Sequence, residues 1–253
     1  MSNPRAARKS KGGIGETIRT LIYAVLIAVV IRTVAFEPFN IPSGSMIPTL
    51  LIGDYLFVSK YTYGYSRYSL PFGIDLFPGR IMDSPPERGD VVVFKLPVDP
   101  SVDYIKRVIG LPGDRIQVRN SVLYINGEPV QRERIEDLVA RNARGEDVRI
   151  PQYVETLPNG RRYRTLDQTP TGSLDDTRVY VVEDGHYFMM GDNRDDSADS
   201  RVTGQVGQVP AQNLVGRAEV LFFSSDGSAH IWEFWKWPTA IRWQRLFKTV
   251  REF

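Results

Sequence analysis

The sequence contains no cysteine, and its only histidines are His186 and His230. The absence of cysteine excludes a disulfide, a thiol nucleophile and a cysteine metal site. The scarcity of histidine disfavours a zinc site, because such sites need roughly three or four convergent nitrogen, sulfur or oxygen ligands. We therefore expect neither a metal nor a cofactor.

The chain also lacks an excess of charge of one sign. Its 32 Lys+Arg and 30 Asp+Glu give a net charge of +2, and the two signs are interspersed, so there is no basic footprint for nucleic acid. We expect no nucleic-acid partner and a monomeric protein. A length of 253 residues allows one sizeable domain, or one domain with an insertion, in addition to an anchor.

Long apolar runs are scarce, and the clearest one lies near the N-terminus. Residues 21–31 are uninterrupted apolar sequence, and residues 1–13 form a basic segment without an acidic side chain. Because a bilayer span needs roughly 20 residues, we predict an anchor over residues 14–36, with Arg19 and Arg32 snorkelling to opposite interfaces. The basic flank predicts a single-pass protein of the inner (cytoplasmic) membrane, with a cytoplasmic N-terminus and the rest on the periplasmic face.

Two alternatives to this anchor stay open. A cleaved secretory signal peptide has the same basic start and apolar core, and residues 33–35 fit its cleavage site. Arg32 interrupts the approach to that site, which favours the retained anchor. The third reading is a buried core helix of a soluble domain, and the basic flank argues against it.

Beyond the anchor the chain is predicted to be mainly β. Short segments rich in β-branched and aromatic residues alternate with Gly, Pro and Asp, at residues 55–60, 90–95, 104–109, 115–119, 122–125, 178–182, 186–190 and 218–223. Asn126 and Gly127 predict a hairpin turn. The predicted parts are a catalytic β domain at residues 37–127 and 177–225, a charged, turn-rich inserted subdomain at 128–176 and an aromatic, amphipathic tail at 226–253.

Two aromatic segments stand apart from these strands. Residues 61–81 predict either a loop at the membrane interface or an aromatic hairpin packed on the sheet, and their aromatic side chains are Tyr61, Tyr63, Tyr65, Tyr68, Phe72 and Phe77. In the tail, apolar residues recur at helical spacing among basic ones, at Trp243, Leu246, Phe247 and Val250. This spacing predicts an amphipathic helix, either packed on its own sheet or bound to anionic lipid.

Two blocks suggest nucleophilic chemistry. In residues 39–50, FNIPSGSMIPTL, Gly44 and two prolines fix a tightly turned backbone around Ser45, which is how a nucleophile is exposed, although an ordinary loop has the same composition. Lys106 lies within the predicted strand 104–109. Strand alternation places it on one face with Tyr104, and from position alone a lysine there is expected to face solvent.

The third block, residues 191–201 with the sequence GDNRDDSADSR, gathers four acids, two arginines and two serines in one loop. A solvated turn or a calcium loop has a similar composition. The arginines, and the lack of Gly and Glu at the positions that a calcium loop requires, argue against calcium.

In this order and after an anchor, the three blocks resemble the bacterial type I signal peptidases, or leader peptidases, the serine-lysine dyad family that removes signal peptides from exported proteins. The resemblance covers residues 36–223, and the block at 191–201 is its most specific part. It implies a signal-peptidase-type catalytic β domain with an inserted second β-rich domain. It also implies that the partners are the signal peptides of secreted preproteins and the phospholipid membrane.

The resemblance further implies roles for individual residues. Ser45 would be the nucleophile and Lys106 the general base, while the Ser43 hydroxyl and the Ser45 backbone N–H would form the oxyanion hole. Ser197 would orient Lys106 through a hydrogen bond. The supporting residues would be Ser197, Arg107 and an ion pair between Asp199 and Arg201.

Substrate pockets follow from the same resemblance, and their residues here are all apolar or aromatic: Phe39, Ile41, Met46, Leu50, Leu56, Val93, Tyr104, Ile105 and Ala198. Shallow apolar pockets predict small residues at the first and third positions before the cut, the Ala-x-Ala pattern. Asp196 stands where the family often has asparagine, and this departure affects local loop contacts.

The mechanism requires an unusual lysine. Free lysine has a pKa of about 10.4 and is charged at neutral pH, so Lys106 must be buried to act as a base. Two rival functions share some of these features. A self-cleaving repressor-type peptidase uses the same pair but is soluble with a DNA-binding domain, and a membrane-anchored adaptor would have no Ser45-dependent reaction.

Overall fold

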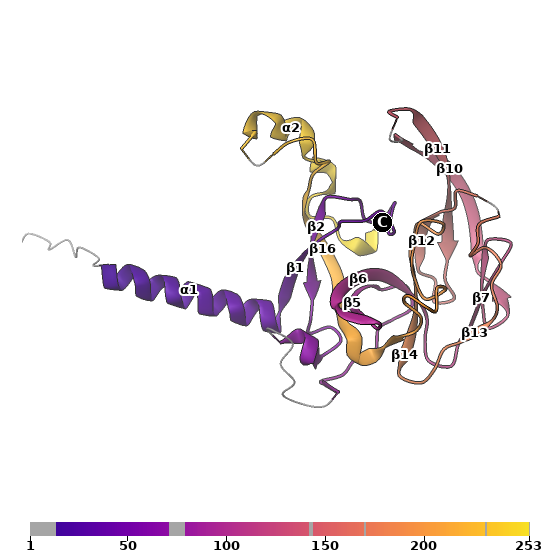
Figure 1. The fold of residues 1–253 in the computed structure, drawn as a ribbon, viewed down its shortest axis with the longest axis horizontal. Helices are drawn as coiled ribbons and strands as arrows, with labels where there is room; N and C mark the ends of the chain where they lie inside the picture. Colours follow the sequence, from indigo (N-terminus) through magenta and orange to yellow (C-terminus); the bar gives the residue numbers. More distant parts are fainter. Residues whose placement is uncertain (1–13, 71–78, 142–143, 170, 231, 253) are drawn as a thin grey trace, which may run out of the picture.

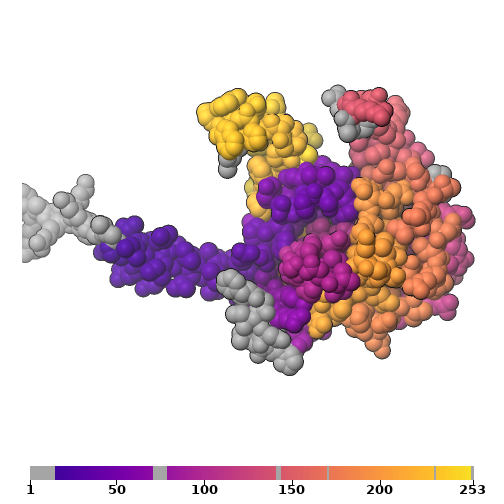
Figure 2. Space-filling view, viewed as in Figure 1, coloured from indigo at the N-terminus to yellow at the C-terminus, as the bar shows by residue number. Residues whose placement is uncertain are grey.

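The N-terminal helix α1 (Ile14–Val34) projects away from the rest of the chain (Figures 1 and 2). The computed structural model describes residues 14–70, 79–141, 144–169, 171–230 and 232–252, so the predicted basic segment 1–13 lies outside the described residues. Within α1, the stretch Gly15–Val34 has a mean hydropathy of 1.9 and is not buried by any other part of the structure. By length and composition this helix is able to span a membrane, and it is compatible with the predicted anchor.

The main body is a seven-stranded antiparallel sheet with the order β1-β2-β16-β5-β6-β14-β15. Its strands are β1 (Phe36–Asn40), β2 (Asp54–Ser59), β5 (Val91–Leu96), β6 (Asp99–Gly110), β14 (His186–Met190), β15 (Val209–Pro210) and β16 (Leu214–Ser224). Apolar side chains of these strands form two buried clusters, one around Leu56, Val58 and Leu221 and one around Phe94 and Val108. The mainly β prediction is confirmed.

A second group of strands packs beside this sheet. A four-stranded sheet, β13-β7-β8-β9, and a three-stranded sheet, β10-β11-β12, make up this part. Their bounds are β7 (Arg115–Arg119), β8 (Val122–Ile125), β9 (Glu128–Pro129), β10 (Gln131–Arg141), β11 (Asp147–Thr156), β12 (Arg162–Leu166) and β13 (Tyr180–Val181). Their apolar faces share a cluster with Ile109, Phe188 and Met190 of the main sheet, which fixes the smaller sheets against the larger one.

The smaller four-stranded sheet draws on both sides of the predicted boundary at residue 127, since β7 and β8 pair with β9 and β13. The domain bounds 37–127, 128–176 and 177–225 stay a prediction. The predicted turn at Asn126 and Gly127 is present, with both residues at positive φ, and it joins β8 to β9 as a hairpin.

The aromatic segment 61–81 is partly described, whereas Phe72 and Phe77 lie outside the described residues. Strands β3 (Tyr65–Ser66) and β4 (Arg80–Ile81) pair with each other. Tyr63 is buried and donates to Asp90 at 2.9 Å, and Tyr65 donates to the Val34 carbonyl at 2.7 Å. These two aromatic side chains therefore serve packing against the domain and the end of α1.

The predicted helix over the tail is wrong. The tail contains the four-residue helix α2 (Trp237–Ala240) and short 3-10 turns at Phe234–Lys236, Trp243–Arg245 and Val250–Glu252. Bridges from Ser225 to Ile241 and from Val220 to Thr249 bind the tail to β16. β5 pairs with β16 only as far as Arg217, so the tail pairs with backbone groups beyond that point, and this pairing satisfies polar groups that a helix would have satisfied internally.

Candidate active site

Ser45 lies in the turn that follows β1, and its backbone is held by the loop 191–201. The carbonyl oxygen of Ser45 accepts a hydrogen bond from the Asn193 backbone N–H at 3.1 Å, and the Gly44 carbonyl accepts from Asn193 Nδ2 at 3.1 Å. The side chain is 7% exposed. A loop more than 140 residues away in sequence thus fixes the hydroxyl at the edge of a cleft.

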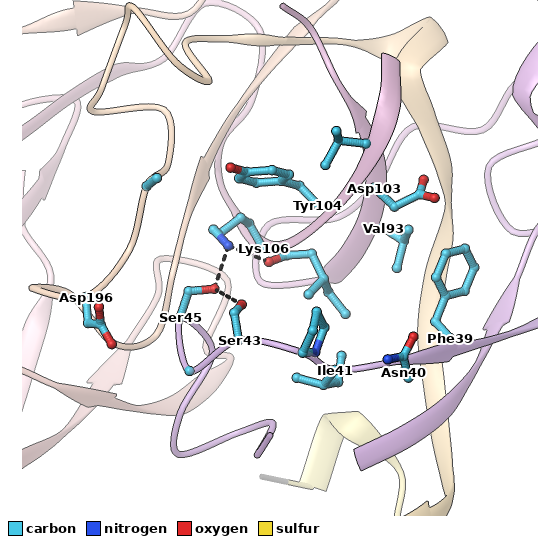
Figure 3. Close-up of a pocket in the computed structure, with 15 residues that line it drawn as sticks. Phe39, Asn40, Ile41, Ser43, Ser45, Val93, Asp103, Tyr104, Lys106 and Asp196 are labelled. Atoms are coloured by element: carbon cyan, nitrogen blue, oxygen red, sulfur yellow. Dashed lines mark hydrogen bonds between the residues drawn. The ribbon is translucent and has the colours of Figure 1, made fainter. Parts of the chain in front are cut away.

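Lys106 reaches this hydroxyl from β6. Its Nζ donates to Ser45 Oγ at 2.7 Å and to the Ile105 carbonyl at 2.9 Å, as Figure 3 shows. The residue is 3% exposed, so the alternative that it faces solvent is wrong. The amine lies 5.1 Å from the centre of the Tyr104 ring, as strand alternation requires.

Burial changes the acidity of Lys106. Loss of water around the ammonium lowers the pKa of Lys106 from 10.5 to about 8, and the negative charges of Asp199 and Asp192 oppose part of this shift. A pKa near 8 leaves a usable fraction of neutral amine at neutral pH. Ser45 and Lys106 therefore have the distance and the lysine pKa that a nucleophile and its general base require.

Ser43 lies beside Ser45. The two hydroxyl oxygens are 3.5 Å apart (Figure 3), and both residues line the same cleft. This position is suited to a donor for an oxyanion that forms on a carbonyl attacked by Ser45.

The hydrogen bond predicted from Ser197 to Lys106 is not formed. Ser197 Oγ is buried and has no hydrogen-bond partner among the described residues, while the Lys106 amine donates to Ser45 and Ile105. Ser197 lies against Gly191, where an added Cβ would contact the Ser197 side chain and come within 2.6 Å of the Ser45 carbonyl oxygen. Glycine at 191 thus permits close packing behind the nucleophile.

The predicted ion pair between Asp199 and Arg201 is present. Arg201 Nη2 lies 2.8 Å from Asp199 Oδ2, with both side chains at 1% exposure or less. Asp199 also accepts from the Gly191 backbone N–H at 3.1 Å, and Arg201 donates to the Arg194 carbonyl at 2.7 Å. Burial raises the pKa of Asp199, but the Arg201 charge and these donors hold it below its usual value.

Arg107, next to the lysine, ties β6 to the same loop. Its guanidinium binds both carboxylate oxygens of Asp192, at 2.8 and 2.7 Å, and donates to the Gly89 carbonyl at 2.8 Å. Thr49 donates to Asp192 from the Ser45 turn. The three sequence blocks therefore meet in one buried network.

Two residues of this network were missed from the sequence, and both come from the predicted insertion. Glu155 on β11 accepts two hydrogen bonds from the Arg194 guanidinium, at 2.9 and 2.6 Å, and a third from the Tyr163 hydroxyl on β12 at 2.6 Å. The Arg107 guanidinium lies 4.3 Å from the centre of the Tyr163 ring. No sequence signal distinguishes Glu155 from the exposed acids around it, because its burial depends on packing against the distant loop.

A cleft of about 500 Å³ opens at Ser45 and Lys106. Six of the predicted pocket residues line it: Phe39, Ile41, Val93, Tyr104, Ile105 and Ala198. The other three, Met46, Leu50 and Leu56, do not line it and have 0% exposure in the core cluster that also contains Ile41 and Val93. Additional wall residues include Asn40, Val102, Asp103 and Asp196.

Acidic side chains also converge outside the cleft. Carboxylate oxygens of Asp167, Asp175 and Asp195 lie within 4.8 Å of one another. Asp167 pairs with Arg132, and Asp195 accepts from the backbone N–H groups of residues 168 and 169. Through these hydrogen bonds and this ion pair, the carboxylates stabilise the loop 191–201 against residues 167–169.

Known proteins resemble this chain over most of its length. Residues 14–223 match the family model described as signal peptidase, peptidase S26. The signal peptidase I of Rickettsia typhi is 40% identical over 260 residues, covering 96% of each chain, and that of Rickettsia prowazekii is 42% identical over 255 residues, covering 94% of each. A solved structure of a signal peptidase I from Enterococcus faecalis V583 is 27% identical, with a TM-score of 0.32, and the match covers 53% of this chain and 97% of that one. By the extent of the family match and the identity to full-length relatives, the chain belongs to the signal peptidase family, peptidase S26.

Proposed function

We propose that this peptidase is a membrane-anchored serine endopeptidase that removes N-terminal signal peptides from exported preproteins, with Ser45 as nucleophile and Lys106 as general base. The observation that carries the proposal is the 2.7 Å contact between Lys106 Nζ and Ser45 Oγ in a site where burial lowers the pKa of the lysine to about 8. The family's peptidase activity supports the reaction class.

The chemistry begins with a neutral Lys106. The amine takes the Ser45 proton while Oγ attacks the scissile carbonyl, and the negative charge moves to the carbonyl oxygen. The Ser45 N–H and the Ser43 hydroxyl would hold this oxyanion, and each such donor is worth roughly 3–4 kcal/mol of transition-state stabilisation. Lys106 then protonates the leaving amine. Water attacks the acyl-enzyme with the same base, which frees the cut signal peptide and restores Ser45.

Substrate preference is proposed from the cleft walls. Phe39, Ile41, Val93, Ile105 and Ala198 present apolar surface close to the catalytic pair. Such walls accept a small apolar side chain at the first and third positions before the cut, the Ala-x-Ala pattern.

Membrane placement is proposed from α1 and its flank. The span Gly15–Val34 is unburied and apolar, and residues 1–13 carry basic charge without acid. This supports a cytoplasmic N-terminus in the inner membrane with the active site on the outer, periplasmic face, where exported preproteins emerge. N-terminal sequencing of the protein from membranes tests retention, since a cut after Ala35 would contradict the anchor.

Cleavage of a signal-bearing preprotein by the full chain in detergent tests the catalytic proposal. We expect Ser45→Ala and Lys106→Ala to abolish cleavage while the protein stays folded. The controls are Ser228→Ala and Lys236→Ala, which change exposed residues of the same types and should cleave normally. Full activity in Lys106→Ala would refute the assignment of the base, and cleavage that does not depend on Ser45 would indicate an adaptor with a contaminating protease.

A further inference from the structure

Three carboxylates from separate segments converge beside the active-site loop. Asp167 directly follows β12, Asp175 lies in the segment that leads to β13, and Asp195 belongs to the loop 191–201. One carboxylate oxygen of each lies within 4.8 Å of the other two. Asp167 and Asp175 are 6% and 2% exposed. Negative charges therefore meet at a place where little water is present to screen them.

The charge of this cluster is only partly balanced. Arg132 Nη2 lies 2.5 Å from Asp167 Oδ2, whereas Asp175 and Asp195 form no ion pair within the described part of the chain. Burial raises the pKa of Asp175, and the negative charges of Asp167 and Asp195 raise it further. Three carboxylates facing one guanidinium leave an excess negative charge that a divalent cation neutralises.

Each carboxylate has one oxygen that no protein donor occupies. In Asp195 the two backbone N–H donors bind Oδ2, and in Asp175 the Gly172 N–H also binds Oδ2. In Asp167 the ion pair with Arg132 uses Oδ2, and the buried Oδ1 has no hydrogen-bond partner among the described residues. The donors thus orient the three carboxylates and leave Oδ1 of each for a further ligand.

The Ser121 hydroxyl is an independent sign of a ligand at this place. Ser121 is 8% exposed, and its Oγ has no hydrogen-bond partner within the part of the chain that the structure describes. Its backbone N–H donates to the Asp175 carbonyl at 3.0 Å, and its own carbonyl accepts from Arg132 at 3.1 Å. The hydroxyl is close enough to the Asp175 carboxyl to lower the pKa of that group. A buried hydroxyl without a protein partner indicates a missing ligand.

The spacing of the oxygens suits calcium. Ca²⁺ binds roughly six to eight oxygen atoms at about 2.3–2.6 Å in flexible geometry, so two ligands of one ion lie at most about 5 Å apart. The carboxylate oxygens satisfy this limit. A Cβ added at Gly172 would lie 2.5 Å from Asp195 Oδ1 and 3.0 Å from Asp175 Oδ2. Glycine at 172 therefore keeps a side chain out of the space between these two carboxylates.

We propose that this cluster is a calcium site whose protein ligands are Asp167, Asp175, Asp195 and Ser121, with water completing the coordination. The sequence led us to expect no metal, because it has few histidines, no cysteine and no contiguous calcium loop. A site assembled from four segments distant in sequence produces none of these local signals.

Bound calcium joins the predicted insertion to the loop that supports Ser45. Leu166, the residue before Asp167, forms a bridge with Asn193. The Asn193 backbone N–H in turn donates to the Ser45 carbonyl at 3.1 Å. By binding Asp195 of the same loop, the ion holds the segment behind Ser45 in place.

Thermal unfolding of the full chain in detergent tests the site. The protein is first freed of divalent ions with a chelator and is then measured alone, with about 10 mM CaCl₂ and with about 10 mM MgCl₂. For a Kd of about 10⁻⁴–10⁻³ M, CaCl₂ should raise the unfolding midpoint by about 3–8 °C. MgCl₂ should raise it less, because Mg²⁺ requires shorter distances and near-octahedral geometry.

A matched pair of variants locates the ion. Asp175→Asn keeps an oxygen for the Gly172 N–H and should abolish the calcium shift. Without calcium its midpoint should be at or above that of the wild type, because repulsion within the cluster is reduced. The control is Asp176→Asn, which changes the adjacent, exposed aspartate outside the cluster and should keep the full shift. Asp195→Asn is a second test of the cluster and should also abolish the shift.

Three results would overturn the inference. One is a wild-type midpoint that does not change with CaCl₂. Another is a calcium shift that persists in both Asp175→Asn and Asp195→Asn, since the ion would then bind elsewhere on the chain. The third is an equal shift with MgCl₂ and CaCl₂, which would indicate screening of charge by any divalent salt. None of these measurements uses cleavage, so they test the calcium site separately from the proposed function.

Discussion

Replacing Lys106 with methionine should stabilise the folded protein at pH 7 while it abolishes cleavage. Burial lowers the pKa of Lys106 from 10.5 to about 8, so the ammonium is less favourable in the folded chain than in the unfolded one. The difference, 10.5 minus 8, is about 2.5 pH units, or about 3 kcal/mol. Loss of the bonds to Ser45 and Ile105 costs about 1–2 kcal/mol, so the net gain is about 1–2 kcal/mol.

The gain depends on pH with a defined sign. Below about pH 8 the amine is charged in both states, and the full penalty on the wild type is present. Between about pH 8 and 10.5 the unfolded chain binds more protons at Lys106 than the folded chain does, so the stability of the wild type rises relative to the variant. The advantage of methionine should therefore shrink through this window.

Thermal unfolding in detergent at pH 7 and pH 10 measures both effects. The control is Lys236→Met, which changes a half-exposed lysine and should show no pH-dependent gap of this kind. A Lys106→Met variant that is less stable than wild type at pH 7 would refute the reasoning. A stability gap of equal size at the two pH values would also refute it.

Three other predictions follow from the same geometry. The wild-type cleavage rate should rise about tenfold per pH unit below about pH 8 and level off above it, since neutral Lys106 is the base; a flat profile in single-turnover assays would contradict this. Ser43→Ala should lower kcat about 100- to 1000-fold with little change in KM, and an unchanged kcat would remove Ser43 from the oxyanion hole. Glu155→Gln should destabilise the fold by about 3–5 kcal/mol, because it leaves the buried Arg194 charge uncompensated. Thermal unfolding measures this loss against the exposed control Glu133→Gln, and equal unfolding midpoints for the two variants would refute it.

Local patterns predicted much of the fold. The strands β7, β8 and β14 have the predicted bounds, because alternation of apolar side chains between Gly and Asn turns is a property of short segments. The tail shows the limit of such patterns. The apolar residues of the tail do recur at helical spacing, but its backbone pairs with β16. Local periodicity does not predict pairing with a strand elsewhere in the chain.

The sequence predicted which residues of the site belong together, from their types and their order in the chain. It predicted less well which of their side chains contact one another. The Asp199–Arg201 pair is formed between neighbours in sequence. The expected bond from Ser197 is absent, and three of the predicted pocket residues, Met46, Leu50 and Leu56, do not line the cleft. These differences depend on side-chain direction, which a strand or turn position defines only after the sheets have packed.

The sequence by itself determined the family, the apolar N-terminal segment and the mainly β body, and it singled out Ser45 and Lys106 as the proposed catalytic pair, since each is encoded in a contiguous stretch of chain. Tertiary structure alone decided that Lys106 is buried, that Glu155 and Tyr163 of the predicted insertion contact the arginines of the site, and that a cleft opens at Ser45 and Lys106. Burial and long-range ion pairs arise where segments distant in sequence exclude water together. The same exclusion of water lowers the pKa of Lys106 and makes the chemistry feasible at neutral pH.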